Sequence, residues 1–200
     1  MRILAVSDVE EERFYTHYTP GRLDGYDLII SCGDLKREYL EFLVTFAHCP
    51  LLYVYGNHDE ALLEHPPEGC ENIDGKLTVF QGLRIMGLGG SYRYKPGPCQ
   101  YTEPQMKRRI LRLIPALIRR RGIDLLVTHA PAYGLGDLNT LPHRGFQCFG
   151  KLLDKYRPKL FLHGHVHRNY GPGIPQKTTY GDTLIVNACG FCELEFPPKA

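Results

Sequence analysis

The chain has 200 residues, of which 43% are hydrophobic and 23% are charged, and its formal net charge is +2. This composition is typical of a globular domain, and no apolar run approaches the about 20 residues that cross a bilayer, so we expect no membrane association. The length suits a single domain, which we predict over residues 1–200. The first residues are typical of a short strand that ends in an acid rather than of a signal peptide, which favours the cytoplasm.

The seven cysteines are scattered along the chain and odd in number. Free thiols in a reducing compartment explain this pattern better than a disulfide framework. Cys189 and Cys192 have CxxC spacing, but no second pair accompanies them, so we assign them neither a metal nor a redox role.

Three successive apolar segments are predicted as strands, and each ends in polar residues that can bind a metal or move a proton. These ends are Asp8 after residues 3–7, Asp34 after residues 28–32, and Asn57, His58 and Asp59 after residues 51–55. Open α/β sheets place their chemistry at the carboxyl ends of strands. One such ending could be a turn or a cap, whereas three in series indicate a site.

The rest of the chain continues the alternation of helices and strands and then forms hairpins. We predict helices over 38–47, 105–121 (interrupted by Pro115) and 146–156, and strands over 77–80, 83–88, 124–127, 183–186 and 191–195. The last two strands are expected to complete a second sheet. This order indicates an α/β fold with two sheets packed face to face.

The helix predicted over residues 105–121 has one apolar side and one basic side. We interpret it as a solvated amphipathic helix rather than a nucleic-acid patch, because no interleaved aromatic residues or RNA-binding signature accompany it.

Three histidines follow the apolar run of residues 160–162, in the order His163, Gly164, His165, Val166, His167. On a strand, alternate side chains share a face, so the three imidazoles could point the same way. We therefore favour metal binding over an ordinary polar strand end. Together with His129, after the strand over 124–127, and the earlier strand ends, the donors are carboxylate, carboxamide and imidazole. Such a set suits Mn²⁺, Fe or Zn²⁺, and it is large enough for two ions.

The motif order resembles the calcineurin-like metallophosphoesterase superfamily, and in particular its small bacterial single-domain members. The matching motifs run from Asp8 through Gly33-Asp34, Gly56-Asn57-His58-Asp59 and Thr128-His129 to Gly164-His165-Val166-His167. The resemblance implies a four-layered αββα sandwich with two mixed sheets. It also implies a hydrolase that uses two divalent metals, with Mn first and Fe or Zn as alternatives.

The resemblance further implies a role for each residue. Asp34 would bridge the metals, Asp8 and His167 would hold the first, and Asn57, His129 and His165 would hold the second. His58 would sit beside the leaving group, with Asp59 orienting its imidazole, while a metal-bridging hydroxide attacks phosphorus. His163 is expected to lie outside the ligand set.

The chain departs from the family pattern at its first motif, which reads Asp8-Val9-Glu10 where a histidine is usual at the third position. Glu10 either replaces that histidine as a ligand of the first metal or points away and leaves the site weak. As a ligand, Glu10 would favour hard ions such as Mn²⁺ and monoanionic phosphodiesters.

We therefore expect a phosphoesterase that acts on small phosphate esters, a class that includes nucleotides, with phosphodiesters as the first choice. The alternatives are a phosphomonoesterase and a metal- or nucleotide-binding interaction protein with weak or no catalysis. Asn57, His58, His143 and Arg144 are candidate substrate contacts, and residues 92–94 could shape the pocket. Nucleic acid is not an expected partner, and the oligomeric state cannot be deduced from the sequence.

Overall fold

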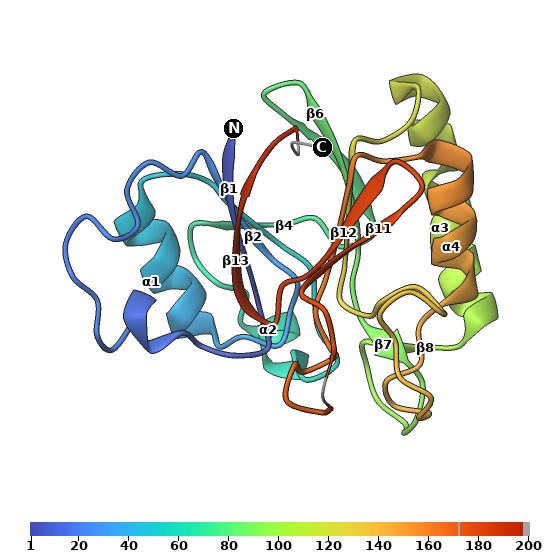
Figure 1. Cartoon of the computed structure of the whole chain (residues 1–200), viewed down its shortest axis with the longest axis horizontal. Helices are drawn as coiled ribbons and strands as arrows, with labels where there is room; N and C mark the ends of the chain where they lie inside the picture. Colours follow the sequence, from blue (N-terminus) through green and yellow to red (C-terminus); the bar gives the residue numbers. More distant parts are fainter. Residues whose placement is uncertain (172, 198–200) are drawn as a thin grey trace.

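The computed structural model describes residues 1–171 and 173–197, so the last three residues of the predicted domain lie outside it. Two sheets pack face to face in the middle of the molecule (Figure 1). Within the described residues the first sheet has five strands, in the order Gly190–Glu195 (β13), Arg2–Ser7 (β1), Leu28–Ser31 (β2), Leu51–Tyr53 (β3) and Cys70–Asn72 (β4). β1 to β4 are parallel, and β13 runs antiparallel to β1.

The second sheet has six strands in the described part of the chain. Their order is Lys177–Tyr180 (β11), Thr183–Asn187 (β12), Leu160–His163 (β10), Leu125–Thr128 (β9), Leu83–Leu88 (β6) and Lys76–Phe80 (β5). The four central strands are parallel, and the two edge strands are antiparallel to their neighbours. A short pair, Ser91–Tyr92 (β7) and Gln100–Tyr101 (β8), lies beside this sheet (Figure 1).

Helices cover the outer faces of both sheets and complete four layers (Figure 1). Arg37–Ala47 (α1) and the short Glu60–Glu64 (α2) pack on the first sheet, and Glu103–Arg120 (α3) and Gln147–Tyr156 (α4) pack on the second. A 3-10 turn, Glu12–Phe14, follows β1. Apolar side chains fill each of the three spaces between layers. The strands in the middle of each sheet are therefore buried on both faces. The predicted αββα sandwich is confirmed.

β13 was expected in the second sheet, and that prediction is wrong. β12 pairs with β10, whereas β13 crosses to the first sheet and pairs with β1 along its whole length, from Arg2 opposite Glu195 to Ser7 opposite Gly190. Gly190 makes the crossing with φ of +76°, a conformation that suits glycine. Alternating hydrophobicity identifies a strand, but it carries no information about which of two stacked sheets the strand joins.

α3 is longer than predicted and continuous. Thr102 Oγ1 accepts a hydrogen bond from the Gln105 amide, and Gln105 Oε1 accepts one from the Thr102 amide, so a capping box starts the helix at Glu103. Pro115 does not interrupt the helix, although it lacks an amide hydrogen. The buried face of Met106, Ile110, Leu113 and Leu117 holds the helix together across that position.

The capping box makes a measurable contribution to stability. We expect Thr102→Ala to lower the free energy of unfolding by about 1 kcal/mol in urea denaturation, because the Gln105 amide loses its hydrogen-bond acceptor. Thr45→Ala is the matched control, since its exposed hydroxyl only bonds back to the Glu41 carbonyl within α1. Equal losses from both variants would contradict a capping role.

Candidate metal centre

The centre lies where the carboxyl ends of parallel strands from both sheets meet. β1 leads into Asp8 and β2 leads into Asp34, while β9 and β10 of the second sheet lead into His129 and His165. Asp8, Asp34 and His165 have φ values of 63°, 57° and 69°, respectively. Non-glycine residues seldom take this left-handed conformation, which is one of the strained backbone states found at functional sites. The chain thus turns sharply where each strand delivers its side chain.

Two buried imidazoles face each other at the middle of the centre. His129 Nδ1 lies 2.8 Å from the Cys32 carbonyl, and His165 Nε2 lies 2.7 Å from the Pro142 carbonyl. Because a carbonyl only accepts, each of these nitrogens carries the hydrogen of its ring. The remaining nitrogens, His129 Nε2 and His165 Nδ1, then present lone pairs to each other at 3.2 Å.

Two side-chain oxygens also lie close to His129 Nε2. Asn57 Oδ1 lies 3.0 Å and Asp34 Oδ2 lies 3.3 Å from His129 Nε2. Ligands about 2.1 Å from one ion are separated by roughly 3.0–3.4 Å when the angle between them is octahedral or tetrahedral. Asn57, Asp34 and His165 thus each lie at a ligand-to-ligand distance from His129 Nε2, and the absence of thiolate suits Mn²⁺, Fe or Zn²⁺.

The electrostatics of the centre also demand a positive charge. Burial lowers the pKa of His129, but the Asp34 and Asp8 carboxylates outweigh burial and raise that pKa to about 9. Burial opposes ionisation of Asp34, yet His129 and the His58 amide lower its pKa to about 2. The pKa of His165 falls to about 3 through burial and the nearby His129. The surrounding carboxylates therefore favour a positive charge at His129, and they would stabilise a divalent cation there for the same reason.

Asp8 and His167 form a second group beside the first. Both Asp8 carboxylate oxygens accept from the His165 amide, at 3.1 and 2.9 Å, and His167 Nε2 lies 3.7 Å from Asp8 Oδ1. Burial raises the pKa of Asp8. Ligand atoms of Asp8, Asp34 and His129 all lie within 4.8 Å of one another, and His167 stacks on the Tyr170 ring. Asp34 stands between the two groups.

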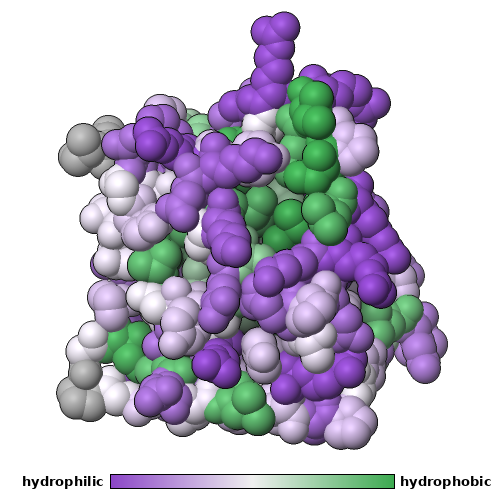
Figure 2. Space-filling view, turned by 90° about the vertical axis from the view of Figure 1, so that its right-hand side faces the viewer, coloured by the Kyte–Doolittle hydropathy of each residue, from purple (hydrophilic) through white to green (hydrophobic). Residues whose placement is uncertain are grey.

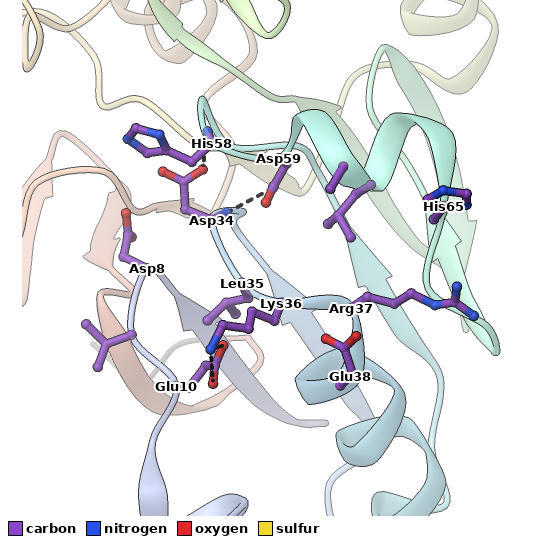
Figure 3. Close-up of a pocket in the computed structure, with 13 residues that line it drawn as sticks. Asp8, Glu10, Asp34, Leu35, Lys36, Arg37, Glu38, His58, Asp59 and His65 are labelled. Atoms are coloured by element: carbon purple, nitrogen blue, oxygen red, sulfur yellow. Dashed lines mark hydrogen bonds and ion pairs between the residues drawn. The ribbon is translucent and has the colours of Figure 1, made fainter.

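Glu10 is not among the residues brought together. Its carboxylate pairs with Lys36 Nζ at 3.3 Å, away from the carboxylates of Asp8 and Asp34 (Figure 3). Of the two alternatives for Glu10, the structure corresponds to the one in which the side chain points away.

The expected common face for the three histidines is wrong. β10 ends at His163, and the backbone turns at Gly164 and His165 before His167. His163 is buried, with Nδ1 3.0 Å from the Gly164 carbonyl, and it lies outside the donor group. The alternation rule fails because it applies only while the chain stays extended.

Asp59 does not have the contact expected of it. Its Oδ2 accepts from the backbone amides of Gly56, at 2.6 Å, and Asp34, at 2.9 Å, so it ties the two metal-site turns together instead of orienting the His58 ring. Burial and then Asp34 raise the pKa of Asp59 to about 6. The His58 amide donates to Asp34 Oδ1 at 2.7 Å, and the exposed imidazole lies beside that carboxylate (Figure 3).

The two remaining candidates for substrate contacts, His143 and Arg144, lie in different parts of the structure. The His143 ring lies 5.3 Å from that of His165 and 4.9 Å from that of Tyr170, at the edge of the centre. Arg144 instead lies over the Tyr133 ring, at 5.5 Å, and lines a different cavity of 530 Å³. Tyr94, one of the residues expected to shape the pocket, places its hydroxyl 3.4 Å from Asn57 Nδ2.

A groove of 780 Å³ opens beside the centre on the side of α1 and α2 (Figure 3). Its lining includes Asp8, Asp34 and His58 at one end, apolar side chains in the middle, and residues 36–38 with His65 further away. Sequence reasoning missed Lys36, Tyr170 and the two carbonyls that orient the imidazoles. Lysine at a helix start and backbone carbonyls carry no motif, so only the folded arrangement shows their part.

Comparison with known proteins identifies the family. The model of the calcineurin-like phosphoesterase superfamily domain matches residues 1–199. The chain belongs to the calcineurin-like phosphoesterase superfamily. Members of this superfamily generally bind divalent metals, and membership supports metal-dependent phosphoesterase activity.

Several superfamily relatives cover most of the chain. An uncharacterized protein of Haemophilus influenzae is 30% identical over 186 aligned positions, covering 76% of this chain and 78% of that protein. Metallophosphoesterase domain-containing protein 1 of Homo sapiens is 23% identical over 238 aligned positions, covering 98% of this chain and 68% of that protein. The crystal structure of TT1561 of Thermus thermophilus has the same fold, with a TM-score of 0.64, 21% identity, and coverage of 94% and 89% of the two chains.

No helix in the described part of this chain is both long and apolar enough to cross a membrane.

Gly164 provides a test of the geometry. A Cβ at this position would collide with Ser7 Oγ and Asp8 Oδ2, so we expect Gly164→Ala to displace Asp8 and weaken Mn²⁺ binding by about 10-fold to 100-fold in calorimetric titration. Gly150→Ala is the control, because a Cβ there meets nothing within 4 Å. Circular dichroism checks that both variants fold, and unchanged binding by folded Gly164→Ala would contradict the placement of Asp8.

Proposed function

We propose that this protein is a phosphoesterase that uses two divalent cations and prefers phosphodiesters. The observation that carries the proposal is the gathering of donor atoms of Asn57, Asp34 and His165 within 3.3 Å of His129 Nε2, beside an open groove lined by Asp34 and His58. A structural metal site would be closed, whereas a hydrolytic site needs such access.

The chain offers a ligand set for each cation. Asp34, Asn57, His129 and His165 would hold one, Asp8 and His167 would hold the other, and Asp34 would be shared. Mn²⁺ is the first candidate, with Fe or Zn²⁺ as alternatives. Bound there, the two cations would neutralise phosphoryl oxygens and make water acidic enough to serve as a nucleophile near neutral pH.

His58 is the residue proposed to act on the substrate directly. Its exposed imidazole beside Asp34 can donate a hydrogen bond or a proton to the leaving oxygen, which would lie in the groove. Asp59 is proposed as a positioning residue, since it fixes the backbone of both Asp34 and Gly56.

The preference for diesters rests on the charge of the groove. Five acidic side chains line it, namely Asp8, Glu10, Asp34, Glu38 and Asp59, against Lys36 and Arg37. Two bound cations would offset Asp8 and Asp34, and the acids left outside the ligand set are Glu10, Glu38 and Asp59. The Glu10 carboxylate, where the family usually has a histidine, disfavours a dianionic monoester more than a monoanionic diester. Small phosphate esters, nucleotides among them, are the proposed substrates.

The first experiment compares hydrolysis of bis-p-nitrophenyl phosphate and p-nitrophenyl phosphate, with Mn²⁺ and with EDTA. We expect metal-dependent turnover of the diester, which His58→Ala lowers by about 10²-fold or more without changing the number of bound metal ions. His65→Ala is the matched control at the far end of the groove and should have little effect. Turnover of the monoester alone would favour a phosphomonoesterase. No turnover despite bound metal would favour a metal- or nucleotide-binding interaction protein.

Glu10 gives a second test. Glu10→His supplies the usual donor of the family, so we expect tighter binding of the second Mn²⁺ equivalent by about tenfold or more, and a lower diester-to-monoester ratio. Glu10→Gln removes the charge without adding an imidazole and should change only the ratio. If Glu10→His altered neither metal binding nor the ratio, position 10 would have no part in the site.

A further inference from the structure

A second surface lies on the opposite side of the molecule, over α3 and α4. A groove of 380 Å³ runs between these helices and is lined by Lys107, Ile110, Leu111, Ile114, Cys148, Lys151, Leu152, Lys155 and Tyr156. Figure 2 faces this side of the molecule and shows a hydrophobic column with hydrophilic surface on both sides of it. We call this groove between the two helices the α3–α4 groove.

An exposed apolar stripe of α3 borders the groove and extends beyond it to Ile118. Leu111 is 65% and Ile118 is 72% exposed, and with Ile114 they are spaced three and four residues apart along one side of α3. This spacing places them in one stripe, about 10 Å long at a rise of about 1.5 Å per residue. Such a stripe is the seam along which two helices pack. The floor between the helices is formed by the buried Ile110, Cys148 and Leu152.

The two helices together carry a large net positive charge. α3 and α4 together contain eight lysines and arginines against Glu103 and Asp154, a net charge of +6, whereas the whole chain has +2. The remainder of the chain is therefore at −4. Both acids are already engaged, Glu103 with the amides of Gln147 and Cys148 and Asp154 with the Tyr180 hydroxyl.

The cations lie along both sides of the stripe. Helical spacing places Arg108, Arg112 and Arg119 along its outer side, and all three are exposed. On the other side of the groove, α4 presents the exposed Lys151 and Lys155. Arg109 does not take part, because it turns inward to Asp74. An apolar seam between two rows of cations complements an apolar seam between two rows of acids.

We infer that the α3–α4 groove docks an acidic amphipathic helix of a partner protein. Apolar side chains of that helix would enter the groove and cover Leu111 and Ile118, while its Asp and Glu residues would meet the arginines of α3 and the lysines of α4. The concave floor suits the knobs of a helix better than a flat bilayer, and the apolar centre distinguishes it from a nucleic-acid surface.

The test uses two designed peptides of about 20 residues, each long enough to form several helical turns. Both have leucines at a and d positions of a heptad; one has Glu at the flanking e and g positions and the other has Lys. With the full chain, fluorescence anisotropy should show salt-sensitive binding of the Glu peptide and no binding of the Lys peptide. Leu111→Ser with Ile118→Ser should weaken binding by about tenfold or more, and so should Lys151→Glu with Lys155→Glu.

Controls separate the alternatives. The variant residues are exposed, so melting temperature and metal-dependent hydrolysis should stay unchanged, which also makes the result independent of the proposed function. Lys36→Glu, an exposed lysine on the other side of the molecule, should bind the Glu peptide as the wild type does. No binding of the Glu peptide, or equal binding of both peptides, would overturn the inference. Binding to phosphatidylserine vesicles instead of the Glu peptide would also overturn it. Self-association in sedimentation that Leu111→Ser with Ile118→Ser abolishes would overturn it too, because a second copy would then occupy the groove.

Discussion

The facing lone pairs of His129 and His165 are the constraint on which the centre depends. Each ring is fixed by a backbone carbonyl, Cys32 for His129 and Pro142 for His165, so while the rings are neutral neither can turn an N–H toward the other. Two such nitrogens 3.2 Å apart in a buried place repel each other unless a positive charge lies close by. The acids around them attract such a charge, and the same attraction raises the pKa of His129.

This constraint makes the site a property of the packed pair of sheets. Asp34 and Asn57 follow strands of the first sheet, while His129 and His165 follow strands of the second, and even the Cys32 carbonyl reaches across to a histidine of the other sheet. The apolar layer between the sheets, with Ile30, Val127 and Leu162 among its members, therefore sets the distances between ligands. Close packing leaves that layer little freedom, so the donors are held in position before any ion binds.

Much of this could be predicted from the sequence, because strands that end in Asp34, Asn57 or His129 combine a hydrophobic pattern with an unusual donor. What could not be predicted depends on contacts between distant segments. Glu10 pairs with Lys36, which stands at the start of α1, 26 residues further along the chain. The Asp59 carboxylate accepts from the Asp34 amide of another turn. β13, near the end of the chain, pairs with β1 at its start. His165 lies beside His129, and a left-handed turn, not the strand alternation expected from the sequence, directs its ring there.

The four layers also separate the two surfaces of the molecule. The groove beside the centre is lined from α1, α2 and the loops of the first sheet, whereas the α3–α4 groove lies on the outer layer of the second sheet (Figure 1). Their charges are opposite, with acids in excess at the first and cations at the second. A helix docked on α3 and α4 would thus leave the groove beside the centre open. Because charges screened by salt interact over only about 10 Å, the cations of the outer layer would also have little influence on an ester bound beside Asp34.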